Sequence, residues 1–117
     1  MGSELAAPGY MHRLREPAAA AMVRDILQRE LGAAEYPGDQ AADVGRRLGA
    51  LIEQRLAAEP GWARYKFIAN IVLLGAGAGA RMGVSSLWDP HADHVVHESL
   101  TTPRLRCVAA VFAVCVY

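Results

Sequence analysis

Apolar residues in the first half of the chain recur every three or four positions, which is the spacing of amphipathic helices. They are Met22, Val23, Ile26, Leu27 and Leu31 in a first stretch, and Val44, Leu48, Leu51, Ile52 and Leu56 in a second. Pro17 suits the first turn of a helix and Gly32 suits its end, so we expect a first helix over residues 17–31. Asp39 is the predicted N-cap of a second helix, which ends before Pro60.

Charged residues of the second helix are expected on its outer, solvated face. They are Arg46, Arg47, Glu53 and Arg55. Residues 1–16 precede the helices as an extended arm, with Leu14 among its few apolar anchors. We therefore divide the chain into an N-terminal arm, residues 1–16, and one domain, residues 17–117.

The second half of the chain has the patterns of strands, either continuous apolar runs or strict alternation. The predicted strands cover residues 65–74, 80–88, 94–100 and 105–116. Gly75, Gly77 and Gly79 allow the backbone to reverse direction after the first of them. Two helices followed by four strands predict an α+β fold. We expect the two helices to pack on one face of a four-stranded antiparallel sheet, connected as a meander.

The last predicted strand is apolar on both faces. One face has Val108, Ala110, Phe112, Val114 and Val116, and the other has Cys107, Ala109, Val111, Ala113 and Cys115. Because two helices cover only one face of such a sheet, the other face must be shielded by the arm, by a second chain, or by both. We expect a dimer in which residues 80–88 cross to the partner. The aromatic residues assigned to the core or to the dimer face are Tyr65, Phe67, Phe112 and Tyr117.

Charge and cysteine content limit the classes of function. The 12 Lys and Arg residues balance the 12 Asp and Glu residues, so neither nucleic acid nor an anionic membrane is expected as a partner. No apolar run reaches the ~20 residues of a membrane span, and the N-terminus lacks the order of a signal peptide, which favours the cytoplasm. Cys107 and Cys115 would lie about 26 Å apart on one strand, so they are expected as reduced, buried thiols.

Two groups of residues could indicate an enzyme. The glycines of residues 75–79 follow an apolar strand, but a dinucleotide-binding loop would have to lead into a helix, and a strand pattern follows here. Ser85 and Ser86 lie near histidines, but they lack the Gly-x-Ser-x-Gly elbow of a hydrolase. We therefore predict no enzymatic activity and no cofactor.

The densest group of metal-capable side chains surrounds the start of the third strand. It comprises Asp89, His91, Asp93, His94, His97 and Glu98. A turn could bring several of these side chains together, but within a strand His94 and His97 point to opposite faces. We favour a solvated turn and predict no metal site. A metal- or pH-responsive binding protein centred on residues 89–98 is the alternative function.

One ordered set of motifs extends over about half the chain. Arg64-Tyr65-Lys66 enters an apolar strand, a Gly-x-Gly turn follows, then Ser85-Ser86 and Trp88-Asp89, and Cys107 to Val114 form the closing strand. In this order the motifs resemble the Tctex-type dynein light chains, above all the axonemal, Tctex-type-two-like branch. Where that family usually has a Glu-Asn pair, this chain has Thr101-Thr102, so the role of that pair is not transferred.

The resemblance implies a non-catalytic, dimeric adaptor that binds the N-terminal part of a dynein intermediate chain and supports assembly of an axonemal dynein arm in a cilium or flagellum. Its partners would be the intermediate chain, a second copy or a related light chain, and other dynein arm subunits. The residues themselves predict binding by strand addition at a sheet edge. The predicted partner- and dimer-binding residues are Ala80, Arg81, Met82, Gly83, Val84, Ser85, Ser86, Leu87 and Trp88.

Overall fold

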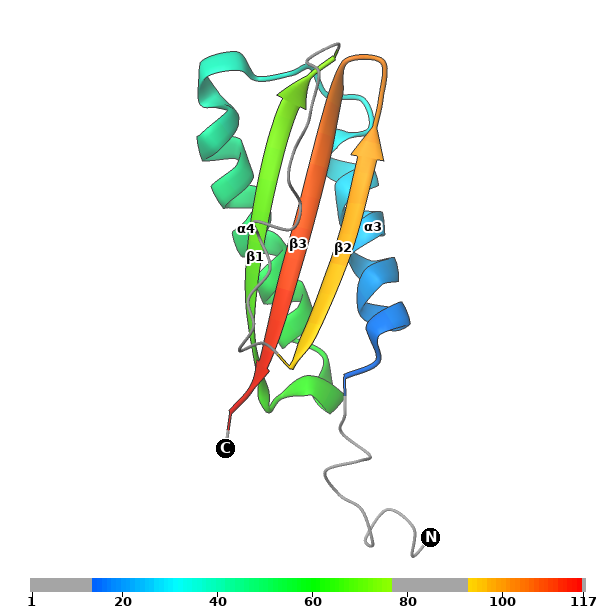
Figure 1. Ribbon diagram of the computed structural model, residues 1–117, viewed down its shortest axis with the longest axis vertical. Helices are drawn as coiled ribbons and strands as arrows, with labels where there is room; N and C mark the ends of the chain where they lie inside the picture. The colour runs from blue at the N-terminus through cyan, green and yellow to red at the C-terminus, as the bar shows by residue number, and fades with distance from the viewer. Residues whose placement is uncertain (1–13, 77–92, 117) are drawn as a thin grey trace, which may run out of the picture.

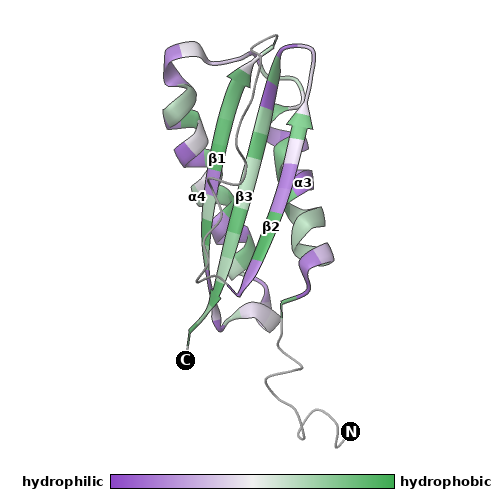
Figure 2. Ribbon diagram, in the orientation of Figure 1, coloured by the Kyte–Doolittle hydropathy of each residue, from purple (hydrophilic) through white to green (hydrophobic). Residues whose placement is uncertain are grey.

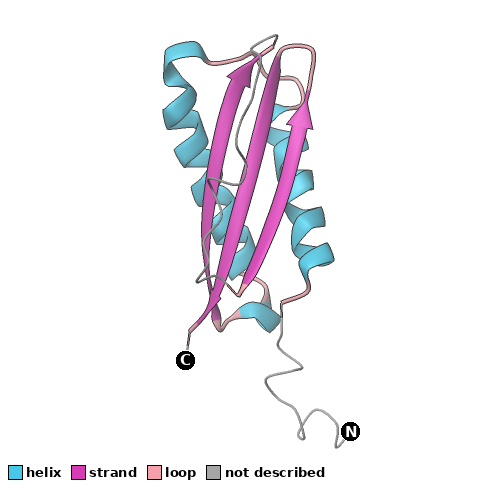
Figure 3. Ribbon diagram, viewed as in Figure 1, coloured by secondary structure: helices cyan, strands magenta, loops and turns pink. Residues whose placement is uncertain are grey.

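The structure, a computed structural model, describes residues 14–76 and 93–116 of the chain. Within these ranges it has two α-helices, α3 (Glu16–Leu31) and α4 (Ala41–Ala57), and three strands, β1 (Tyr65–Gly75), β2 (His94–Thr101) and β3 (Leu105–Cys115). Two short 3-10 helices, η1 (Gly38–Gln40) and η2 (Pro60–Trp62), precede and follow α4. Figure 3 shows the two layers, one of helices and one of strands. The α+β class is confirmed.

Both α-helices lie where the apolar periodicity predicts them. α3 begins one residue before Pro17, and Gly32 is its C-cap. The predicted N-cap of α4 is wrong, because Asp39 lies inside η1 and no side chain caps α4. Instead, the N–H of Ala41 donates to the carbonyl of Gly38, so η1 leads directly into the helix through a backbone hydrogen bond. No helix in the described part of the chain is long and apolar enough to span a membrane.

The three strands form an antiparallel sheet in the order β1-β3-β2. The meander prediction is wrong, since β1 pairs with β3 along its whole length, from Tyr65 opposite Cys115 to Gly75 opposite Leu105. β3 is the strand that is apolar on both faces, and the central position covers such a strand best. The predicted strand of residues 80–88 lies outside the described residues, so the described sheet has three strands.

Both helices cover the same face of the sheet, with α4 packed on β1 and α3 packed on β2 (Figure 1). The core lies between these layers, and its largest fully buried side chains are Val23, Leu27, Ile52, Leu56, Leu105 and Cys107. Burial of each large aliphatic side chain contributes about 1.5–3 kcal/mol. At one end of the core, Trp62 of η2 is buried against Phe67, with ring centroids 6.3 Å apart. Phe67, which the sequence assigned to the core or the dimer face, lies in this buried cluster.

The N-terminal arm enters the core at Leu14. This side chain is only 4% exposed, and its backbone N–H donates a 3.2 Å hydrogen bond to the Tyr65 hydroxyl. The predicted anchoring role of Leu14 is confirmed, and residues 1–13 of the arm lie outside the described residues. Tyr65, predicted for the core or dimer face, packs partly buried against the core on the helix side of the sheet.

The face of the sheet that points away from the helices is also apolar along β3. Val108, Ala110 and Phe112 are buried there without belonging to the core under the helices. Beside Phe112 in the ladder lies Ile68 of β1, which is 38% exposed. Figure 2 shows β1 and β3 as hydrophobic over most of their length, whereas β2 has a hydrophilic stretch. The prediction of two apolar faces on the last strand is therefore confirmed.

Candidate functional site

β1 and β2 are the outer strands of the described sheet, and their outer backbone groups determine where another strand could pair. Val116 N donates to Arg64 O at 2.6 Å, and Ala76 N donates to Arg104 O at 3.2 Å. The even-numbered residues of β1 therefore direct their backbone groups toward β3. The odd-numbered residues, among them Ala69, direct theirs to the outer edge.

Helix α4 occupies this edge of β1. The backbone N–H of Ala69 donates a 2.9 Å hydrogen bond to Oε2 of Glu53. One and two helical turns before Glu53, Gly49 and Gly45 lie so close to the strand that a Cβ atom would be 3.1 Å from the carbonyl oxygens of Ala69 and Ile71, respectively. The expectation that Glu53 lies on the solvated outer face is wrong, because its carboxylate satisfies a strand amide. The β1 edge is thus covered where another strand would have to pair.

The opposite edge, along β2, presents a different arrangement. Thr102 N donates to Leu105 O at 2.9 Å, so even-numbered residues of β2 direct their backbone groups toward β3. The residues whose N–H and C=O groups point to the outer edge are Val95, His97, Ser99 and Thr101. Within residues 14–76 and 93–116, no other strand pairs with β2 on this side. The described residues therefore leave the outward backbone groups of β2 without a pairing strand.

The turn between β2 and β3 holds these two strands in their pairing register. Thr102 Oγ1 accepts hydrogen bonds from the backbone N–H groups of Arg104 and Leu105, both at 3.1 Å. Pro103 occupies the second position of the turn, where its fixed φ angle is favourable. The hydroxyl of Thr102 therefore holds the turn from which β2 and β3 pair.

Side chains beside the β2 edge are polar on the face away from the helices. His97, Ser99, Arg106 and Val108 line a shallow cleft of about 240 Å³ there, together with Glu98. Toward β1, the same face becomes apolar, with Val95 opposite Phe112 and Phe112 opposite Ile68. A strand added at β2 would therefore have a polar rim beside it and an apolar surface next to that rim.

Two contacts between α3 and β2 lie on the helix side of the sheet. Nδ1 of His94 lies 2.6 Å from Oε2 of Glu16, and its ring meets Tyr65 edge-on at a centroid distance of 5.7 Å. The guanidinium group of Arg24 contacts both carboxylate oxygens of Glu98, at 3.3 and 3.1 Å. These contacts attach β2 to the helix layer at two points.

The alternative metal site does not form from the described residues. His94 points toward α3, whereas His97 lines the cleft on the opposite face, as the strand alternation predicts. The carboxylate of Asp93 accepts a 2.6 Å hydrogen bond from the backbone N–H of Cys115. No group of three or more possible metal ligands converges among the residues with described positions. Asp89 and His91 lie outside them.

The two cysteines are free thiols on β3. Cys107 is fully buried on the helix side, and burial raises the pKa of its thiol from 9.0 to about 12. Cys115 is partly exposed at the end of the strand. The prediction of two unbridged thiols on one strand is confirmed, but only Cys107 is fully buried.

The predicted binding segment, Ala80 to Trp88, lies outside the described residues, as does Tyr117. The described structure shows instead the outer edge of β2 and, beside it, the apolar face that includes Phe112. The sequence reasoning missed Glu53 as the residue that covers the β1 edge. The available signal was the spacing of Gly45, Gly49 and Glu53, which are four residues apart and so lie on one side of the helix. Small residues at this spacing allow close packing against a neighbouring strand.

The fold and the edge together define a class of protein. It is a two-layer α+β domain in which a helix covers one edge of the sheet, while the described residues leave the other edge free for pairing. The comparisons with known proteins give the family. The model of the Tctex-1 family matches residues 13–114, which include all the described helices and strands except the last residue of β3. The chain therefore belongs to the Tctex-1 family.

Similar proteins come from several vertebrates. The chain is 31% identical over 111 residues to the dynein light chain Tctex-type protein 2B of Mus musculus, covering 94% of this chain and 76% of that protein. It is 30% identical to the protein of the same name from Danio rerio, covering 94% of this chain and 73% of that protein. The resemblance to Tctex-type dynein light chains is thus confirmed.

Proposed function

We propose that this protein is a non-catalytic dynein light chain that works as a dimeric adaptor. It binds an extended segment of a dynein intermediate chain by strand addition and supports the assembly of an axonemal dynein arm in a cilium or flagellum. Family membership supports the dynein setting, because the similar proteins from Mus musculus and Danio rerio are Tctex-type dynein light chains. The remaining partners in this proposal are other dynein arm subunits.

The observation that carries the proposal is the difference between the two edges of the sheet. Glu53 and the glycines of α4 cover the β1 edge, whereas β2 has outward backbone groups over residues 95–101. Strand addition uses such backbone groups for affinity and neighbouring side chains for specificity. An incoming strand therefore has one edge at which to pair, and this gives the complex a defined orientation.

Dimerisation follows from the same edge and from the apolar face beside it. In the proposed dimer, the Ala80 to Trp88 segment of one copy pairs with β2 of the other copy, and Trp88 adds a large apolar anchor. The intermediate-chain strand then pairs with the outer edge of that crossed segment, at the seam between the two copies. The partner is a second copy or a related Tctex-type light chain. The exposed side chain of Ile68 and the neighbouring Phe112 support this arrangement, because contiguous apolar surface favours a protein–protein contact.

A proline substitution at the β2 edge tests this mechanism. Ser99→Pro removes an outward N–H from an exposed position, and Ser99→Ala is the matched control because it retains the N–H. We expect Ser99→Pro, unlike Ser99→Ala, to lose most of its dimer in sedimentation and most of its capture of an intermediate-chain peptide. Val84→Pro should have the same effect from the other strand.

Circular dichroism must show that the proline variants retain their secondary structure. If folded Ser99→Pro keeps both dimerisation and peptide binding, the edge mechanism is wrong. Purification from axonemes, followed by identification of the proteins that co-elute, tests the proposed cellular setting independently of the mechanism.

A further inference from the structure

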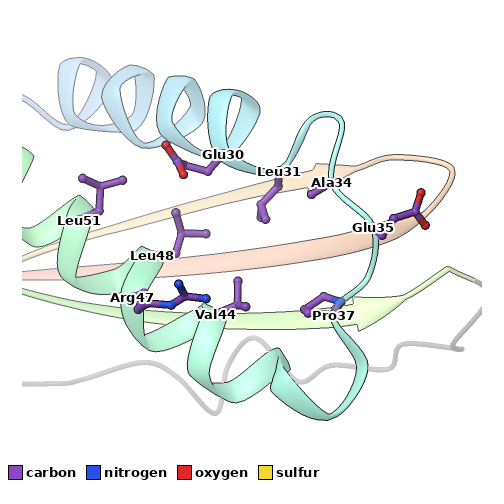
Figure 4. A pocket seen from close by; sticks show the side chains of 9 residues that line it. All are labelled: Glu30, Leu31, Ala34, Glu35, Pro37, Val44, Arg47, Leu48 and Leu51. Atoms are coloured by element: carbon purple, nitrogen blue, oxygen red, sulfur yellow. The ribbon is translucent and has the colours of Figure 1, made fainter.

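A second surface, apart from the β2 edge, lies on the helix layer and is formed by α3, α4 and the loop between them. Between the end of α3 and the first half of α4 is a cleft of about 400 Å³ (Figure 4). Its apolar lining consists of Leu31, Ala34, Pro37, Val44, Leu48 and Leu51. A volume of this size falls within the range of sites that receive a ligand or a few side chains.

The placement of the helices explains why the core does not fill this cleft. α4 packs on β1 and α3 packs on β2, so the two helices sit over opposite outer strands. Gly45 and Gly49 let α4 approach the backbone of β1 closely. Val44, Leu48 and Leu51, at intervals of four and three residues, then form an apolar stripe facing the end of α3. Leu31 and Leu48, both nearly buried, form the floor.

The two walls of the cleft carry opposite charges. Glu30 comes from α3 and Arg47 comes from α4, on either side of the apolar floor (Figure 4). Neither of them forms a salt bridge with another residue in the described ranges. Glu35, at the loop, points away from the cleft and lies 3.8 Å from Arg104. Glu30 and Arg47 are therefore available to charged groups of an occupant.

We propose that this cleft docks a short amphipathic helix of a partner protein. Val44 and Leu51 are seven residues apart, about 10 Å along α4, which matches two apolar anchors two helical turns apart on the incoming segment. A basic side chain of that helix would face Glu30, and an acidic side chain would face Arg47. The occupant is thus defined by an apolar stripe with positive charge on one flank and negative charge on the other.

Two designed peptides of identical composition test this proposal with the full chain. Each is a fluorescein-labelled 14-residue helix with leucines seven positions apart as its apolar anchors. One has Lys on the flank that would face Glu30 and Glu on the other flank, and the second has these charges exchanged. We expect the first peptide to bind about five-fold more tightly in fluorescence anisotropy, because it makes two attractive charge pairs with the walls where the second peptide makes two repulsive ones.

The double variant Glu30→Lys, Arg47→Glu exchanges the charges of the walls and leaves the apolar floor intact. It should prefer the second peptide by a similar factor. Arg55→Glu, an exposed charge reversal elsewhere on α4, should leave the preference of the wild-type chain unchanged. Circular dichroism confirms that each variant is folded.

Several results would overturn the proposal. One is the absence of binding by either peptide up to about 1 mM protein, and another is equal binding of the two peptides. A third is binding of the dye 8-anilinonaphthalene-1-sulfonate that neither peptide displaces, which would assign the cleft to a small apolar ligand. Self-association that disappears in the double variant would assign it to a second copy of the chain.

Discussion

The carboxylate of Glu53 accepts a 2.9 Å hydrogen bond from the backbone N–H of Ala69, joining helix α4 to the outer edge of strand β1. A glutamate on a helix usually points to solvent, but this one satisfies a strand amide that would otherwise face outward at the edge. The same contact prevents another strand from pairing there. One side chain thus satisfies a strand amide and covers the β1 edge.

Replacing Glu53 by leucine should destabilise the fold by about 1–3 kcal/mol, because the partly buried Ala69 N–H would lose its acceptor. Glu53→Gln retains an acceptor oxygen and should lose less than half as much. Urea unfolding measures the two losses. Hydrogen exchange at Ala69 should accelerate in the leucine variant, and unchanged protection of this amide would show that the hydrogen bond is unimportant.

A larger side chain at Gly49 should separate α4 from β1. A Cβ atom there would be 3.1 Å from Ala69 O, and the hydrogen-bonded strand cannot move away without disturbing its pairing with β3. We expect Gly49→Leu to cost about 1–3 kcal/mol in unfolding free energy, as overpacking does. Ala50→Leu, on the exposed side of the same turn, should change it by less than about 0.5 kcal/mol. Equal effects of the two substitutions in thermal unfolding would contradict this explanation.

The raised pKa of Cys107 predicts how stability depends on pH. Its thiol has a pKa of about 12 in the folded chain, against an ordinary value of 9.0, because burial disfavours the thiolate. The folded state therefore retains the proton that the unfolded state loses. This contribution is fully present below pH 9 and is lost as pH rises toward 12, at up to about 1.4 kcal/mol per pH unit.

Cys107→Ala isolates that contribution from other groups that titrate at alkaline pH. The stability difference between the wild type and this variant should shrink as pH rises from 9 toward 12, and Cys115→Ala serves as the control. At neutral pH, iodoacetamide should modify Cys115 well before Cys107. A difference in stability that stays constant with pH would disprove the assignment to the Cys107 thiol.

The hydroxyl of Thr102 should be measurable in the stability of the β2–β3 turn. Thr102→Ala removes the acceptor for two backbone N–H groups, those of Arg104 and Leu105, and should cost about 1 kcal/mol. Thr102→Ser keeps the hydroxyl and should retain most of this stability. Denaturant unfolding compares the two variants, and identical losses would indicate that the methyl group, not the hydroxyl, stabilises the turn.

Local patterns predicted the elements of this fold well. The three-to-four spacing around Leu27 and Leu48 predicted both helices, and the apolar character of residues 105–116 predicted a strand covered on both faces. These features depend on neighbouring residues, so the sequence alone displays them. The opposite orientation of His94 and His97 also followed from strand geometry alone.

Pairing and packing between distant segments could not be predicted in the same way. The meander assumed that consecutive strands pair, whereas β1 pairs with β3, whose partner residues lie thirty to fifty positions further along the chain. The sequence pattern indicated that Glu53 is a surface charge. Its role as a hydrogen-bond acceptor depends on Ala69 lying beside α4, which the local pattern does not show. The N-cap rule failed at Asp39 because the start of α4 has a backbone hydrogen bond instead, from the N–H of Ala41 to the carbonyl of Gly38 in η1. In each case the deciding contact was absent from the local pattern.

The central position of β3 also affects how the protein folds during its synthesis on the ribosome. β1 and β2 each find their partner in residues 105–115, so neither can enter the three-stranded sheet until that segment has emerged. Until then, the apolar sides of the helices and of β1 are incompletely covered. Exposed apolar surface of this kind makes a partly folded chain prone to aggregation. A stop codon before residue 105 would therefore remove the centre of the sheet, not merely one of its edges.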